Sequence, residues 1–188
     1  MRDIDIRSSL LQSLDLEYGS DPDTMVVEEF GLCRGSARVD VVVINGSIHG
    51  FEIKSERDTL RRLPKQQEIY NKTLDFVTLV TSRSHIKSAR EIIPKWWGIA
   101  EARHSTEGII IKEVRKPKLN KSVDPYSLAQ LLWRPEVLSV LREHNLHRGL
   151  SKKSVDYLWG QLARQLTKFD LGAEIRSRIK ARQYWRSD

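Results

Sequence analysis

The sequence lacks the features that mark disulfide-stabilised, secreted or membrane-spanning proteins. It contains one cysteine, Cys33, which excludes an internal disulfide framework and a cysteine-based zinc site. No apolar run approaches the roughly 20 residues that a membrane helix requires. Charges at residues 2, 3, 5 and 7 interrupt the amino-terminal segment, which is therefore not a secretory signal. We expect a cytoplasmic protein that does not interact with a membrane.

Acidic residues are scarce in the carboxy-terminal part of the chain. Residues 1–114 hold 16 Lys and Arg against 18 Asp and Glu, a net charge of −2, whereas residues 115–188 hold 16 against 7, a net charge of +9. This asymmetry favours a polyanionic partner for residues 115–188, and nucleic acid is the commonest one. A solvated helical surface is the alternative.

The hydrophobic pattern changes character near residue 115. Before it, the pattern predicts helices and strands in alternation: a helix at 3–14, strands at 24–30, 39–44 and 48–53, a helix at 55–74, a strand at 76–82, a helix at 84–93 and a strand pair at 96–102 and 108–114. After it, the pattern predicts helices only, at 124–132, 134–145, 152–166 and 171–185. We expect an α/β core at residues 1–114 and an all-helical basic segment at residues 115–188.

Two neighbouring apolar strands each carry one isolated acid, Asp40 and Glu52. A two-residue Asn-Gly turn between the strands would mix acids with core residues on both faces. A three-residue loop, Asn45-Gly46-Ser47, instead pairs residues whose numbers sum to 92. Val39, Val41 and Val43 then share one face with Ile53, Phe51 and His49. Asp40 lies across from Glu52 on the other face, with Lys54 beside them.

This grouping of charged side chains indicates a metal site. Carboxylates opposed at roughly 5 Å between Cβ atoms repel each other unless a proton or a cation lies between them. Mg²⁺ typically uses one or two carboxylates together with water and phosphate oxygens, and a nearby lysine can stabilise charge on a reacting phosphate. The alternative is a pair of strand-edge carboxylates neutralised by arginines such as Arg38 and Arg57.

The same residues resemble the motifs of the PD-(D/E)XK nuclease superfamily. "RVDVVVI" is similar to the motif with the metal-binding Asp, here without its proline, and "FEIKS" is similar to the (D/E)-x-K motif. "QQEIY" places Gln66 and Tyr70 as in the Q-x-x-x-Y motif of the exonuclease-like branch. The resemblance covers roughly residues 3–82. It implies a restriction-endonuclease-like fold, in which a mixed central sheet is flanked by helices.

The resemblance also implies a role for each matching residue. Asp40, Glu52 and the backbone carbonyl of Ile53 would hold Mg²⁺ (or Mn²⁺), and Lys54 would help to activate the attacking water. Gln66 would contact a phosphate or the Lys54 region, and Tyr70 would support it from the same helix face. The superfamily often adds an upstream acid. Here Glu29 ranks first, on the premise that Phe30 points into the core, and its rivals are Glu28, Asp3 and Asp5.

We therefore expect a metal-dependent nuclease that hydrolyses phosphodiester bonds in DNA, with RNA as the alternative polymer. A non-catalytic nucleic-acid-binding or regulatory protein on the same fold is the rival interpretation, and the intact Glu52 and Lys54 pair favours the enzyme. We expect the nucleic-acid-binding surface on the last predicted helix. There, four cations flank an apolar stripe of Leu171, Ile175 and Ile179: Arg176, Arg178, Lys180 and Arg182.

Overall fold

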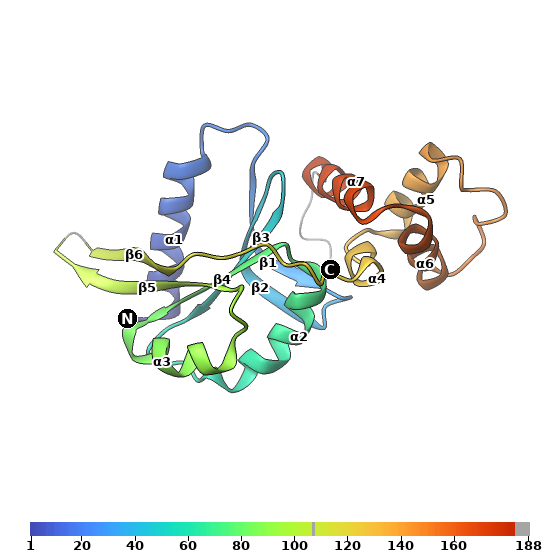
Figure 1. Cartoon of the computed structure of the whole chain (residues 1–188). Coiled ribbons are helices and arrows are strands. Elements are labelled where there is room, and N and C mark those ends of the chain that lie inside the picture. Colours follow the sequence, from blue (N-terminus) through green and yellow to red (C-terminus); the bar gives the residue numbers. More distant parts are fainter. Residues whose placement is uncertain (107, 183–188) are drawn as a thin grey trace.

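The computed structural model describes residues 1–106 and 108–182. Its centre is a six-stranded sheet in which the strands are neighbours in sequence order, from β1 to β6 (Figure 1). β2 (Ala37–Ile44) is antiparallel to both of its neighbours, β1 (Met25–Leu32) and β3 (Ile48–Lys54). β4 (Phe76–Ser82) is parallel to β3 and to β5 (Gly98–Ser105), and β6 (Gly108–Arg115) is antiparallel to β5. The predicted mixed sheet is thus confirmed.

Helices cover both faces of this sheet. α1 (Asp3–Tyr18) lies on one face, and α2 (Leu63–Thr73) and α3 (Arg83–Ile92) lie on the other (Figure 1). The remaining helices, α4 (Pro125–Ala129), α5 (Arg134–Glu143), α6 (Val155–Gln165) and α7 (Lys168–Ala181), gather at one end of the molecule (Figure 1). The predicted α/β class with a carboxy-terminal helical segment is confirmed. No helix within the described residues is both long and apolar enough to cross a bilayer.

Element boundaries differ most from the prediction around residues 55–74. Residues 55–59 are not helical, and a short 3₁₀ turn, Leu60–Arg62, precedes α2. Pro64 lies in the first turn of α2, where its missing N–H has no helical partner to lose. α7 begins earlier than predicted because Thr167 caps it by accepting a hydrogen bond from the Asp170 N–H. Residues 183–185 of the helix predicted at 171–185 lie outside the described residues.

The β2–β3 hairpin has the predicted register. Val41 lies opposite Phe51 and Val43 opposite His49, so the connection is the three-residue loop. The Asn45 side chain fixes this loop by accepting a hydrogen bond of 3.1 Å from the Ser47 N–H. The hydrogen-bonded ladder ends at Val41 and Phe51, so the predicted cross-strand pairs of Asp40 with Glu52 and of Val39 with Ile53 are not formed. The strands separate just where Asp40 and Glu52 follow.

The prediction that Val39 shares a face with Val41 and Val43 is wrong. Val41 and Val43 pack with Phe51 and Ile53 beneath α1, whereas Val39 belongs to the cluster on the α2 side of the sheet. The neighbouring strand explains the reversal. Glu29 in β1 has a φ of 54°, which is rare for a residue with a side chain, and the pairing skips Glu29 between its partners on either side. The alternation of faces is therefore interrupted on both strands next to Asp40.

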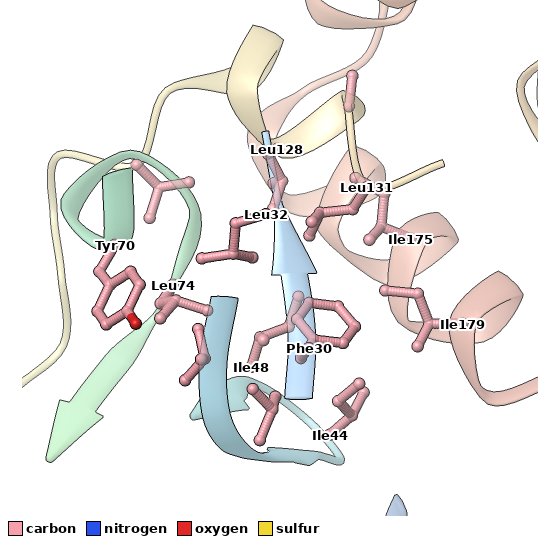
Figure 2. Packing of buried hydrophobic residues seen from close by; sticks show 14 of the residues in the cluster. Phe30, Leu32, Ile44, Ile48, Tyr70, Leu74, Leu128, Leu131, Ile175 and Ile179 are labelled. Carbon is pink, nitrogen blue, oxygen red and sulfur yellow. The ribbon is translucent and has the colours of Figure 1, made fainter. Parts of the chain in front are cut away.

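Two hydrophobic clusters hold the layers together. The smaller one joins α1 to the sheet through Ile6, Leu10 and Leu14. The larger one joins the sheet, α2, α3 and the helical segment. Figure 2 shows how residues of the sheet face residues of α4, α7 and the turn that follows α4. The labelled residues of these elements are Phe30, Leu32, Ile44, Ile48, Leu128, Leu131, Ile175 and Ile179.

Candidate active site

The predicted site residues of β3 and α2 come together on the α2 side of the sheet. Glu52 and Lys54 lie near the end of β3, two residues apart, so both project to the same side. Gln66 and Tyr70 are four residues apart on α2 and therefore share one helix face. All four side chains meet at the carboxylate of Glu52, which is the centre of the site.

The Glu52 carboxylate is buried and fully engaged, since its side chain is 1% exposed. The Gln66 amide donates to Oε1 at 2.7 Å, and the Tyr70 hydroxyl lies 2.5 Å from Oε2. The Lys54 ammonium forms an ion pair with Oε1, and Lys54 is itself only 5% exposed. The Tyr70 hydroxyl also lies 2.7 Å from the carbonyl of Arg38, so this ring ties α2 to both β2 and β3.

Electrostatics at this site depend on desolvation and on the second acid. Burial raises the pKa of Glu52, and the negative charge of Asp40 raises it further, while Lys54 acts in the opposite direction. Burial also raises the pKa of the Tyr70 hydroxyl, and the Glu52 charge adds to that effect. Tyr70 therefore remains a protonated donor, and the site holds two carboxylates within electrostatic reach of each other.

Asp40 occupies the point where β2 and β3 separate. Its Oδ2 atom accepts a hydrogen bond of 2.7 Å from the backbone N–H of Ile53, in place of a ladder partner. Its Oδ1 atom accepts one of 3.0 Å from Arg7, and the second terminal nitrogen of Arg7 donates to the Asp40 carbonyl at 2.9 Å. Asp40 is thus approached from α1, whereas Glu52 is approached from α2.

Arg7 is the site residue that the sequence analysis missed. It projects from α1, with its side chain 12% exposed, and lies within ion-pairing distance of four acids: Asp3, Glu28, Glu29 and Asp40. Burial lowers the pKa of Arg7, but the charges of Asp40, Asp3 and Glu29 more than compensate and raise it. The one signal in the sequence was the placement of Arg7 one helical turn after Asp3 and next to Ile6, which is buried.

The candidates for the upstream acid are separated by their contacts with Arg7. Glu29 lies 2.9 Å from an Arg7 nitrogen, and Asp3 and Glu28 lie at 3.6 and 3.8 Å. Asp5 instead faces Arg2 at the start of α1, away from this group. Burial raises the pKa of Asp3, as does the charge of Asp40, so Asp3 also belongs to the same electrostatic cluster.

The acids therefore converge on a guanidinium rather than on a common cavity. Within residues 1–106 and 108–182, no group of three or more His, Cys, Asp or Glu side chains is placed to hold a metal ion. Two carboxylates and the Ile53 carbonyl nevertheless lie at this strand end, and oxygen donors of this kind suit a hard divalent cation. Such a cation would have to displace partners that now engage both carboxylates. Gln66 Oε1 is buried and has no hydrogen-bond partner among the described residues, which leaves one further acceptor beside Glu52.

Most of the cations predicted to bind nucleic acid form ion pairs with acidic side chains of the protein. Arg178 pairs with Glu143 and Glu174, and Lys180 pairs with Asp23. Arg182, whose side chain is 6% exposed, lies 2.7 Å from Glu136 and 4.2 Å above the Trp133 ring. Arg176 is the one of the four without an acidic partner in the described part of the chain. The apolar stripe of Leu171, Ile175 and Ile179 is buried as predicted.

Comparisons with known proteins found one family model, one curated relative and one solved structure similar to this chain. A family model described as "Bacteriophage P4 protein cII" matches residues 1–187. "Protein cII" of Enterobacteria phage P4 is 23% identical over 146 residues, which cover 78% of this chain and 55% of that protein, so the match spans about half of the relative's length. Among solved structures, the SPO1766 protein of unknown function from Silicibacter pomeroyi has a TM-score of 0.51 at 21% identity, covering 79% of this chain and 92% of that one. At such identity the similarity extends to the fold alone.

Proposed function

The chain belongs to the bacteriophage P4 protein cII family, and from the geometry of its site we propose that it is a metal-dependent nuclease that hydrolyses phosphodiester bonds in DNA. We propose further that it acts in the cytoplasm. One observation carries the proposal. A buried Glu52 and Lys54 pair lies at the end of β3, beside a second carboxylate, Asp40, where the hairpin strands separate.

The burial of this pair supports a chemical role. Removing a carboxylate and an ammonium from water costs several kcal/mol per ion, and apolar residues of similar volume often serve a core equally well. Here the pair adds no cross-link between elements, since both residues lie on β3. Gln66 and Tyr70 of α2 instead hold the Glu52 carboxylate in one orientation. Fixed orientation of this kind is what a catalytic group requires.

The proposed chemistry assigns a task to each residue. Asp40, Glu52 and the Ile53 carbonyl would hold Mg²⁺ or Mn²⁺, which when bound would polarise the phosphate and a water molecule. The Lys54 ammonium would orient the attacking water and offset the charge that develops on the phosphate oxygens. Gln66 and Tyr70 would keep Glu52 in position. The backbone of Lys54 is itself held, because the Thr81 hydroxyl donates to its carbonyl at 2.6 Å.

A non-catalytic nucleic-acid-binding or regulatory protein is the second candidate function, and Arg7 is the observation that favours it. Arg7 and the Ile53 N–H together engage both carboxylate oxygens of Asp40. A permanent guanidinium in this position would neutralise Asp40 and Glu29 without a metal ion. The two candidates therefore differ in whether a divalent cation can compete with Arg7.

Cleavage assays on the purified full chain test the proposal. Single-stranded, duplex and branched DNA are incubated with and without Mg²⁺ or Mn²⁺. Wild-type protein should cleave at least one substrate only when metal is present, and Lys54→Ala should reduce the rate at least about 100-fold, the usual contribution of a positioned catalytic group. Lys65→Ala, which removes an exposed lysine at the start of α2, is the matched control and should cleave normally.

Two outcomes would count against the enzyme. Cleavage at the wild-type rate by folded Lys54→Ala would remove the assigned role of the lysine. Binding of nucleic acid without metal-dependent cleavage of any substrate would support the second candidate instead. Circular dichroism of each variant establishes that the fold is intact.

A further inference from the structure

A basic concave surface lies between α3 and the β5–β6 hairpin, outside the site described above. We call it the basic furrow and define it by five cations: Arg83, Lys87, Arg90, Arg103 and Lys112. Its volume is about 470 Å³, and Ile86 and Val114 complete its lining together with one acid, Glu101. The surface therefore combines five positive charges with a single negative charge.

The secondary structure places these cations on one surface. Arg83, Lys87 and Arg90 follow the helical spacing of four and three residues, so they form a stripe along α3. On the sheet, Glu101 of β5 lies opposite Lys112 of β6, and Arg103 lies two residues further along the same face. Ala102, which lies between them, faces the α1 side instead.

The cations of the furrow are not neutralised by the protein. All five are exposed, and none forms an ion pair with a carboxylate in the described residues, 1–106 and 108–182. Arg178 and Lys180 of α7 and Arg182, which follows that helix, by contrast all have acidic partners. Like charges gathered on a concave surface repel one another and attract a polyanion.

The furrow begins at the edge of the candidate active site. Thr81 of β4 is in register with Lys54 of β3, and its hydroxyl binds the Lys54 carbonyl. α3 starts at Arg83, only two residues after Thr81. A chain of phosphates lying in the furrow would therefore extend toward Lys54.

We propose that the basic furrow binds the sugar-phosphate backbone of duplex DNA. The inference rests on the proposed nuclease function, because it assigns the surface that would hold the substrate of that site. The stripe from Arg83 to Arg90 is about 10 Å long at the rise of an α-helix. That length corresponds to about three nucleotide steps of one strand, measured along the axis of B-DNA. Exposed arginine and lysine side chains suit contacts of this kind, which carry no sequence information.

Binding measured without cleavage tests the furrow separately from the chemistry. In a Lys54→Ala background and without added metal, fluorescence anisotropy follows a labelled 20-base-pair duplex over a range of salt concentrations. The triple variant Arg83→Ala, Lys87→Ala and Arg90→Ala should bind more weakly. Its plot of log K against log salt should be shallower by about 0.9 for each phosphate that the variant can no longer neutralise.

The matched control removes the same charge from the other region. Arg142, Arg148 and Lys152 are exposed and have no ion pair in the described part of the chain, and their triple replacement by Ala should leave the salt slope unchanged. The single variant Lys87→Glu serves as a second test that does not depend on the folding of the triple variant, and it should also weaken binding.

Three results would overturn the inference. An unchanged salt slope in the furrow variants would mean that DNA binds at another surface. Equal reductions in affinity in the furrow and control variants would mean that the loss of affinity follows from the change in net charge alone. Binding to phosphatidylserine vesicles but not to duplex DNA would make the partner a lipid surface. Failure of the cleavage assay alone would reject the nuclease function and leave DNA binding by the furrow intact. Normal cleavage together with unaltered DNA binding in the furrow variants would support the nuclease function and reject the furrow as the DNA-binding surface.

Discussion

The α/β core and the helical segment carry their charges in opposite ways. Residues 115–188 have a net charge of +9, yet three of the four cations predicted to contact nucleic acid are paired with acids. Residues 1–114 have a net charge of −2, yet they contain the five cations of the basic furrow, none of which forms an ion pair within residues 1–106 and 108–182. The charge summed along a segment therefore does not locate the surface that remains charged after folding.

Two ion pairs join the helical segment to the core, whereas those of Arg178 and Arg182 lie within the segment itself. Lys180 of α7 meets Asp23, which precedes β1 and is 157 residues away in sequence. Arg34, in the loop between β1 and β2, meets Asp156 of α6 at 3.1 Å. These ion pairs add to the apolar contacts in which α4 and α7 face the sheet (Figure 2). Cations of α7 thus contribute to the fold, whereas Arg83, Lys87 and Arg90 of α3 form no ion pair within residues 1–106 and 108–182.

The largest expected effect tests whether the cations of α7 are structural. Arg182→Ala should lower the free energy of unfolding by about 3 kcal/mol, because the Glu136 carboxylate, whose side chain is 15% exposed, loses its charged partner and keeps only the Trp133 N–H as a donor. The stacking of the guanidinium on Trp133 is removed as well. Urea unfolding at pH 7 measures the change.

Lys180→Ala is the control for this prediction. Its partner, Asp23, is 74% exposed, so the decrease in unfolding free energy should stay below about 1 kcal/mol. If the two variants were equally stable, Arg182 would not be anchored as the structure indicates, and the comparison between the two regions would fail.

An intermediate effect concerns acid sensitivity, which we expect to reside in the core. His49 of β3 stacks on Phe51, and its ring lies 2.9 Å from the Thr78 hydroxyl. Burial lowers the pKa of His49 to about 4. Between about pH 6.5 and 4 the unfolded chain then binds more protons than the folded protein, so stability falls as the pH falls, by up to about 3 kcal/mol.

Comparison of variants isolates this contribution. His49→Gln should flatten the decline in unfolding free energy between pH 6.5 and 4, relative to the wild-type protein. Burial of Glu52 acts in the opposite direction, because a raised carboxyl pKa favours the folded state at low pH, and it is common to both proteins. His144→Gln, in the helical segment, is the control. An identical pH profile for wild type and His49→Gln would contradict the prediction.

The smallest effect concerns the competition between Arg7 and a divalent cation for the same carboxylates. Arg7→Gln should tighten Mn²⁺ binding about tenfold, equivalent to about 1.4 kcal/mol, because a positive charge leaves the neighbourhood of Asp40 and Glu29. Electron paramagnetic resonance of free Mn²⁺ measures the affinity without requiring activity. Arg2→Gln, which removes an exposed cation from the start of α1, is the control, and Mn²⁺ affinity that stays equal in both variants would show that Arg7 does not compete.

Much of the site followed from local patterns in the sequence. The spacing of apolar residues selected the three-residue loop, and the four-residue interval between Gln66 and Tyr70 placed both side chains on one helix face. The exception at Val39 arises from the backbone of Glu29 on the neighbouring strand, where the pattern of side chains contains no corresponding signal. Arg7 and the ion pairs of α7 depend on distances between remote segments, and such distances are set by packing rather than by spacing along the chain.

The larger hydrophobic cluster has a consequence for how the protein folds. Leu32 and Ile44 of the sheet are completely buried, and so are Ile175 and Ile179 of α7, and all four belong to the same cluster (Figure 2). α2 and α3 would still cover part of this side of the sheet in a chain ending at residue 115, but the apolar residues of β1 and β2 that face α4 and α7 would be exposed to water. We therefore expect the core and the helical segment to unfold in one cooperative transition, although they differ in charge and in secondary structure.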